Sequence, residues 1–261
     1  MSAQPVRFRA AGFAPRSLPA AGGATLVGLL LIWQAAAALG WIDTRFLPPP
    51  LGILRALRDL AVSGELWRHL GASLRRLGIG WGIGTMCGVA VGVLVGVSSW
   101  VRSPAMAVVS AVFPIPKIAL VPLFIIWFGI GEGSKLVTLS LGVFFPTVIA
   151  TAAAVDQVPR GLIRMAQSFG LSRAAILGKV VLPGALPGIL GGFRVSAGIA
   201  ITLLVAAEMI GAEEGIGAFV LQAGNLYDTD NLLAGIVVLS VLGLLVAWVV
   251  GWLERLLLGW R

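Results

Sequence analysis

The chain has 261 residues, of which 58% are hydrophobic and only 11% carry a charge. In a soluble domain roughly a quarter of the residues are charged, and even a compact fold exposes much of its chain, so the composition excludes a soluble enzyme. The abundance of apolar residues excludes disorder as well. The formal net charge of +8 comes from basic residues scattered between apolar runs, which indicates membrane topology rather than nucleic-acid binding. The sequence therefore predicts an integral membrane protein.

Six stretches qualify or nearly qualify as a transmembrane helix, which needs about 20 mostly apolar residues. The predicted spans are, in chain order, residues 24–41, 77–100, a proline-interrupted segment within 106–130, 136–155, 186–210 and 232–253. These runs are too long for strands and lack the alternation of a membrane barrel. We therefore predict an all-α membrane protein with about six transmembrane helices.

The first span follows Arg7, Arg9 and Arg16, a combination that also occurs in cleaved signal peptides. The apolar run is longer than a usual signal core and ends at Trp41, a residue type that anchors helices at the membrane interface. We expect a retained helix, with residues 1–23 as a cytoplasmic segment and 24–261 as one transmembrane domain. Cleavage of the first span is the alternative.

Basic residues predict the orientation, because loops on the cytoplasmic side carry an excess of Lys and Arg. A cytoplasmic N-terminus places most of the loop cations inside: Arg7, Arg9, Arg16, Arg102, Arg160, Arg164, Arg173, Lys179, Arg255 and Arg261. Six arginines in the loop between the first two spans oppose this orientation: Arg45, Arg55, Arg58, Arg68, Arg75 and Arg76. The amphipathic stretch 51–60 within that loop can lie flat at the interface.

On the second span, glycine recurs every four residues, at Gly84, Gly88, Gly92 and Gly96. Glycines at this spacing form a smooth strip that lets helix backbones approach closely in a membrane. We predict a tight helix contact, either within the bundle or between two copies of the chain.

The third span is the first candidate for a gate or a translocation pathway. Pro114, Pro116 and Pro122 remove backbone donors from it, and such irregular backbone must be buried in protein or line a watery cavity. Broken helices often line substrate routes. A purely structural kink is the alternative.

Three ionisable residues within the spans are further pathway candidates, because an unpaired charge in a membrane is costly. Lys117 can attract an anion or extend toward the inner interface. Arg194 can line a pathway or form a buried ion pair. Glu208 would repel an anion, so we expect it at the outer interface, as a hydrogen-bond acceptor or a contact for a binding protein.

The loop between the fourth and fifth spans, residues 156–183, has the pattern of two short amphipathic helices. Gly170 can supply the left-handed backbone at the end of the first helix, and Ser172 can cap the second. Pro183 and Pro187 are expected to stop that helix and begin the fifth span. Two basic amphipathic helices suit docking into a partner's groove, and a hairpin bound to anionic lipid is the alternative.

The run RMAQSFGLSRAAILGKVVLPGALPGI in this loop resembles the cytoplasmic loop motif of ABC-importer permease subunits. The second Ala, the Gly, the Ile, the Leu and the Pro of that motif correspond to Ala166, Gly170, Val180, Leu182 and Pro183. Arg164 stands where the family has Glu, and Met165 where it has the first Ala. The runs FPIPKIALVPLFIIWFGIGEGSK and FRVSAGIAITLLVAAEM resemble the nitrate, sulfonate and taurine branch, and WIDTRFLPPP and SGELWRHL resemble its aliphatic-sulfonate permeases in particular.

The resemblance implies a type I ABC-importer permease in the bacterial inner membrane. Two copies would pair with two ATPase subunits, which bind ATP and Mg, and with an extracytoplasmic substrate-binding protein, while this chain would bind no cofactor. The ATPase-coupling residues would be Arg164, Ala166, Gly170, Leu171, Ser172, Leu182 and Pro183. Closure of the ATPases would move the loop and alternate access to a central pathway.

The residues themselves suggest no catalytic or metal site. Residues 129–135, GIGEGSK, imitate a phosphate-binding loop, but Ser134 stands where the motif needs its second Gly and no strand precedes it. Cys87 is the only cysteine and His69 the only histidine, and we interpret His69 as a loop or interfacial side chain. We expect a permease for a small anion, with aliphatic sulfonates ahead of nitrate, taurine or bicarbonate. A stand-alone channel or secondary transporter is the alternative from another class.

Overall fold

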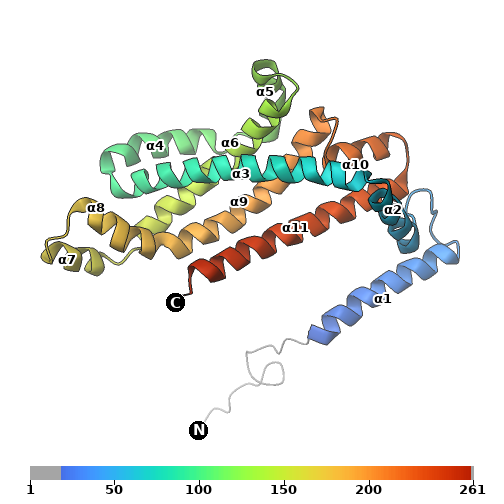
Figure 1. Cartoon of the computed structure of the whole chain (residues 1–261), viewed down its shortest axis with the longest axis horizontal. Coiled ribbons are helices and arrows are strands. Elements are labelled where there is room, and N and C mark those ends of the chain that lie inside the picture. The colour runs from blue at the N-terminus through green and yellow to red at the C-terminus, as the bar shows by residue number, and fades with distance from the viewer. Residues whose placement is uncertain (1–18, 260–261) are drawn as a thin grey trace, which may run out of the picture. The chain divides into compact units, whose positions relative to one another are not determined.

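The structure, a computed structural model, describes residues 19–259 (Figure 1). Between these limits the chain forms helices and no strand, which confirms the predicted all-α class. Arg7, Arg9, Arg16 and Arg261, on which part of the predicted orientation rests, lie outside the described residues, as does most of the predicted cytoplasmic segment 1–23.

Contacts divide the chain into two units, one up to Arg55 and the other Ala56–Arg261. The first unit contains α1 (Pro19–Ala38) and a turn, and the division falls within α2 (Pro50–Ser63). The apolar stretch of α1, Gly22–Ala38, is shorter than the roughly 20 residues that cross a bilayer. In the turn, Asp43 accepts hydrogen bonds from the side chain and the backbone of Arg45, which lower the pKa of that carboxyl.

In the second unit, four helices are long and apolar enough to cross a membrane: α3 (Glu65–Val97), α6 (Glu132–Asp156), the continuous helix Arg173–Gly211 and α11 (Thr229–Leu257). The predicted third span is a bent pair, in which α4 (Ser99–Val112) meets the segment Lys117–Phe128 at 84°. The predicted count of six is therefore not reproduced. The described residues give four spans, or five if the bent pair counts as one.

The core of the second unit is the contact of α6 with α3 on one side and with α9 (Leu182–Gly211) on the other. Leu139 and Val143 of α6 and Leu204 of α9 are completely buried there. One end of this bundle carries α10 (Ile216–Asn225), and the opposite end carries α7 (Arg160–Ser168) and α8 (Arg173–Ile176) (Figure 1). The remaining elements are η1 (Lys117–Leu120), α5 (Val121–Phe128) and the π-helical segment η2 (Leu177–Val181).

Helix α3 begins at Glu65, well before the start predicted at residue 77. The hydropathy pattern missed this part of the helix because Arg68, Arg75 and Arg76 interrupt the apolar run. The placement of these arginines in a loop is wrong, and so is the interpretation of His69 as a loop or interfacial side chain, because both Arg76 and His69 lie on α3 and are only 4% exposed.

The prediction that Pro183 and Pro187 stop the helix before the fifth span is also wrong. The helix is continuous over Arg173–Gly211, and both prolines lie inside it. A proline within a helix lacks the N–H for its hydrogen bond, and its ring crowds the carbonyl four residues earlier. The π-helical segment η2 ends at Val181, two residues before Pro183, and widens the helix there, which accommodates this ring without ending the helix.

Candidate functional site

The first candidate site is the hairpin formed by α7, α8 and η2, residues 160–181, which we call the Gly170 hairpin. Gly170 has a φ of 74°, the left-handed conformation that the sequence predicts for it. Its N–H donates to the carbonyl of Gln167 at 2.9 Å, and the N–H of Leu171 donates to the carbonyl of Ala166 at 3.2 Å. This pair of hydrogen bonds is a Schellman motif, which satisfies the last carbonyls of α7 and fixes the direction in which the chain leaves it.

The hairpin is tied stiffly to the bundle. The Ser172 hydroxyl accepts a hydrogen bond from the N–H of Ala175 at 3.3 Å, so the predicted cap is confirmed. Ala166 of α7 and Ile176 of α8 are buried in one apolar cluster with Val155 at the end of α6. Since α8 continues through η2 into α9, a displacement of the hairpin is carried directly into a long helix of the bundle.

The other predicted ATPase-coupling residues take three different positions. Arg164 is exposed on α7, Leu171 is half-buried beside Gly170, and Leu182 and Pro183 are exposed at the start of α9. A cavity of about 510 Å³ separates part of the hairpin from the ends of α3 and α6. Arg160, Gln167 and Arg173 line it from the hairpin side.

In the broken third span, Lys117 donates to backbone carbonyls at the break. The Lys117 ammonium donates to the carbonyls of Val112, Phe113 and Ile115 at 2.8, 3.0 and 2.8 Å. A lysine ammonium has three donors, so all of them are used within the chain. Pro114, Pro116 and Pro122 are exposed on this segment, whereas Lys117 is buried and has no donor left for an anion in this conformation.

The predicted glycine strip of α3 lies against α6. A side chain at Gly88 or Gly92 would collide with Thr147 or Thr151, and one at Gly96 with Val155, at 2.5–2.7 Å from an added Cβ. A Cβ added at Gly84 would likewise collide with Val143 and with the backbone of Ser140. The strip therefore permits a close contact of two helices within one chain.

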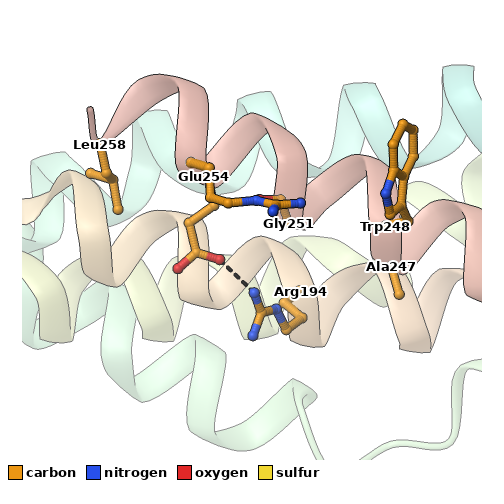
Figure 2. Close-up of a pocket in the computed structure, with 7 residues that line it drawn as sticks. Arg194, Ala247, Trp248, Gly251, Glu254 and Leu258 are labelled. Carbon is orange, nitrogen blue, oxygen red and sulfur yellow. Dashed lines mark hydrogen bonds and ion pairs between the residues drawn. The ribbon is translucent and has the colours of Figure 1, made fainter. Parts of the chain in front are cut away.

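Arg194, the cationic pathway candidate on α9, forms an ion pair with Glu254 of α11 at 2.6 Å (Figure 2). The Arg194 side chain is 61% exposed, so the pair is not a buried one. Both residues line a surface pocket of about 500 Å³ together with Trp248, Gly251 and Arg255.

At the end of the bundle opposite the Gly170 hairpin lies a set of charged groups, Arg76, Glu132 and Glu208, which we call the Arg76 cluster. Arg76 and Glu208 are buried, and Glu132 is partly exposed. The Arg76 guanidinium donates to Glu208 at 2.8 Å and to Glu132 at 2.6 Å, and also to the backbone carbonyl of Glu214. Arg76 is 4% exposed and Glu208 is completely buried. The cluster thus connects α3, α6 and α9, and Glu208 does not face an open pathway in this structure.

Neighbouring polar groups complete the cluster and hold the loop before α10. The Ser73 hydroxyl lies 2.8 Å from Glu208 and accepts a hydrogen bond from the N–H of Ile216 at 2.9 Å. Glu208 also accepts from the N–H of Gly217 at 2.9 Å, and His69 Nδ1 accepts from the N–H of Gly215 at 3.1 Å. The three backbone N–H groups of the turn 215–217 therefore each have a partner on α3 or α9.

The sequence analysis identified Glu208 as a candidate. It did not identify Ser73, Arg76 and Glu132 as the residues that surround it. One signal was present: His69, Ser73 and Arg76 follow one another at spacings of four and three residues, which places them on one face of a helix. The partner of that face is distant in sequence, so only the tertiary structure reveals it. No group of three or more His, Cys, Asp or Glu side chains within the described residues could hold a metal ion.

Comparison with known proteins defines the class. Residues 84–259 match the family described as binding-protein-dependent transport system inner membrane component. The chain is 42% identical to the aliphatic sulfonates transport permease protein SsuC of Escherichia coli (strain K12), over 90% of this chain and 89% of that protein. It is 40% identical to the taurine transport system permease protein TauC of the same organism, over 91% of this chain and 88% of the relative.

A solved structure of the MetNI methionine ABC transporter in an inward-facing conformation shares the fold, with a TM-score of 0.62 and 25% identity over 71% of this chain and 92% of that chain. The chain therefore belongs to the binding-protein-dependent transport system inner membrane components. It is a multi-pass membrane permease of an ABC importer, a transport subunit rather than an enzyme, whose partners are an ATPase and a substrate-binding protein. The membership favours this class over a stand-alone channel or secondary transporter.

Proposed function

We propose that this permease carries small organic sulfonates, with aliphatic sulfonates as the main substrates. The observation that carries the proposal is the similarity, over about nine tenths of the chain, to two relatives named for aliphatic sulfonates and for taurine. Taurine is itself an aminosulfonic acid, so both names denote the same anionic head group. Nitrate and bicarbonate are the competing substrates.

In the proposed assembly, two copies of the chain pair with two ATPase subunits and one binding protein in the bacterial inner membrane. The N-terminus and the Gly170 hairpin lie on the cytoplasmic side, and ATP and Mg are bound by the ATPases. The basic residues of the hairpin support its placement on the cytoplasmic side, because cytoplasmic loops are enriched in Lys and Arg.

The Gly170 hairpin is the proposed point at which the ATPase acts on the bundle, through Arg164, Ala166, Gly170, Leu171, Ser172, Leu182 and Pro183. Its stiffness supports this role. The Schellman turn fixes α7 against α8, and α8 runs without interruption into α9, which packs on α6 and α11. A rigid-body displacement of the hairpin therefore tilts a central helix, as alternating access requires.

We propose that the pathway runs along the broken third span, where Pro114, Pro116 and Pro122 interrupt the helix. In this scheme Lys117 supports the break by satisfying its carbonyls. Of the two cationic pathway candidates, Lys117 and Arg194, only Arg194 is exposed. Glu208 acts through the Arg76 cluster rather than by contacting substrate.

The test is ATP-driven uptake of radiolabelled ethanesulfonate, taurine and nitrate into proteoliposomes that contain this chain, its ATPase and its binding protein. We expect uptake of both sulfonates and little uptake of nitrate. Uptake of nitrate alone would contradict the substrate class, and uptake without the ATPase would contradict the importer.

The same assay tests the hairpin with a matched pair of glycine substitutions. Gly170→Val should abolish sulfonate uptake, because a β-branched residue is strained at positive φ. Gly178→Val should retain uptake, since Gly178 is on the same hairpin and has open space around it. If Gly170→Val retains as much uptake as Gly178→Val, the hairpin conformation has no part in the mechanism.

A further inference from the structure

The pocket between α9 and α11 in Figure 2 lies at the end of a membrane span. Residues 231–253 of α11 contain no charged side chain and are long enough to cross a bilayer. Glu254 and Arg255 are the first charges after this run, so they lie where the span meets water. The ion pair with Glu254 places Arg194 of α9 at the same level. α11 starts beside α10 and runs toward the end that carries the Gly170 hairpin (Figure 1), which is the cytoplasmic end under the proposed function.

The pocket carries more positive than negative charge. Among the described residues that line it, Arg194 and Arg255 are cationic and only Glu254 is anionic. A guanidinium has five N–H donors. Within residues 19–259, Arg194 donates only through Nη2 to Glu254, at 2.6 Å, and Arg255 only through Nε to the carbonyl of Gly251, at 3.3 Å. Both side chains are exposed, so most of their donors are open to a ligand.

The two guanidinium groups come from different helices and meet at Gly251. A Cβ added at Gly251 would lie 3.8 Å from Nη2 of Arg194, and Arg255 donates to the carbonyl of the same glycine. This hydrogen bond runs back along α11 by one turn, toward the apolar run. It therefore holds the charge of Arg255 over the pocket rather than beyond the end of the helix.

An exposed apolar surface continues from the pocket toward the middle of the span. Leu244 and Trp248 of α11 are 71% and 61% exposed. They precede Gly251 by seven and three residues, which places them on its side of the helix. Cations at the membrane boundary with an apolar wall on the bilayer side suit an amphiphile that has an anionic head group and a hydrocarbon tail. A small free anion would contact the cations alone.

We infer that this pocket binds the phosphate of an anionic phospholipid of the cytoplasmic leaflet between Arg194 and Arg255. Basic pockets between transmembrane helices on the cytoplasmic side recognise acidic lipid head groups, and tryptophan is enriched at the same depth. The bound phosphate bridges α9 and α11. The inference rests on the proposed function only for the side of the membrane, and the proposed pathway along the broken third span does not depend on it.

The test measures binding of palmitoyl-oleoyl-phosphatidylglycerol to the full-length chain in dodecyl maltoside by native mass spectrometry. Arg194→Gln and Arg255→Gln should each weaken the affinity about fivefold, the contribution of one basic residue near an anionic lipid surface. The matched control is Arg102→Gln, which removes an exposed arginine that also pairs with a carboxylate at 2.6 Å but lies outside the pocket. This control should leave the affinity unchanged.

Glu254→Gln distinguishes a lipid site from an ion pair that merely joins two helices. In the inferred site, Glu254 competes with the phosphate for Arg194, so its neutralisation should strengthen phosphatidylglycerol binding. If the pair only held α9 to α11, Glu254→Gln and Arg194→Gln would weaken binding alike, and that result would overturn the inference. An unchanged affinity in both Arg194→Gln and Arg255→Gln would overturn it as well. Thermal unfolding without added lipid checks that each variant is folded.

The head group and the tail are tested separately on the unchanged chain. Zwitterionic phosphatidylcholine should bind more weakly than phosphatidylglycerol, and equal affinities would refute a site for anionic lipid. Excess sodium ethanesulfonate should displace no more phosphatidylglycerol than sodium chloride of the same ionic strength, because it lacks the chains that pack on Leu244 and Trp248. Selective displacement by ethanesulfonate would instead make the pocket a site for the free anion. None of these measurements involves the ATPase, so the proposed function stands or fails in the uptake assay alone.

Discussion

The charged side chains at the two ends of the helix bundle differ in burial and in pairing. At the Arg76 cluster, Arg76 and Glu208 are buried, and each of them has several partners. At the Gly170 hairpin, three cations, Arg164, Arg173 and Lys179, are exposed and have no partner within the described chain. Buried charges must be paired to be tolerated, whereas exposed and unpaired charges cost little and remain available to another molecule. The charges of the first end are therefore paired within the fold, whereas those of the second end remain available to a partner.

Between these ends, the glycine strip of α3 holds that helix close to α6. This contact connects the two regions mechanically, since α3 contributes to the Arg76 cluster at one end and to the cavity beside the hairpin at the other. Substitutions at Arg76, Gly92 and Arg102 are expected to destabilise the protein to decreasing extents.

Arg76→Met should destabilise the protein by about 3–5 kcal/mol, because it leaves Glu208 buried without its cation. The measurement is denaturant-induced unfolding of the detergent-solubilised chain. The matched control is Arg75→Met, one residue along α3, where the side chain is 62% exposed and lies 3.4 Å from Glu132. This control should cost about 0–1 kcal/mol.

A double variant tests whether the lost stability comes from the unpaired charge of Glu208. Adding Glu208→Gln to Arg76→Met removes the unpaired charge and should recover part of the lost stability. Equal, small losses for Arg76→Met and Arg75→Met would show that burial of the cluster does not determine its importance, and the contrast between the two ends would be lost.

Gly92→Ala should destabilise the protein by about 1–3 kcal/mol, because the added Cβ would lie 2.5 Å from the Cβ of Thr151 on α6. Gly82→Ala on the same helix has nothing within 4 Å of its added Cβ. It should be neutral or stabilise the helix by up to about 1 kcal/mol. Thermal unfolding of both variants checks this, and a Gly92→Ala variant as stable as Gly82→Ala would show that α3 and α6 can separate without cost.

Arg102→Gln should have the smallest effect. Arg102 pairs with Asp156 at 2.6 Å near the hairpin, but the two side chains are 47% and 41% exposed. Exposed ion pairs contribute little because water and salt screen them. We expect no measurable change in the unfolding midpoint. A loss comparable to that of Arg76→Met would contradict the distinction between a buried and an exposed set of charges.

Local patterns predicted several features correctly. The glycine at position 170 and the serine at 172 have the conformations expected from their places at a helix end and a helix start. Such features depend on hydrogen bonds between residues only a few positions apart, so they can be inferred from the sequence. The family was likewise recognisable, because its loop motif occupies a fixed spacing that ends at Leu182 and Pro183.

Helix limits and side-chain partners could not be inferred in the same way. Charged residues were taken as the end of a membrane span, whereas α3 includes Arg68, Arg75 and Arg76. Prolines were taken as the end of a helix, whereas η2 lets the helix continue through Pro183. Each rule failed because of a compensating feature that it does not consider: a distant carboxylate for Arg76, and a widened turn just before the proline.

Composition, periodicity and motif spacing are properties of the linear chain, and they are enough to identify a helical membrane permease with a basic loop that turns at a glycine. Which charges are neutralised depends on the folded structure. Arg76 and Glu208 are 132 residues apart and meet at 2.8 Å, while Lys117 turns to carbonyls of its own broken span. The physical reason is that the cost of a charge depends on its burial and its partners, and both are fixed by packing of distant segments.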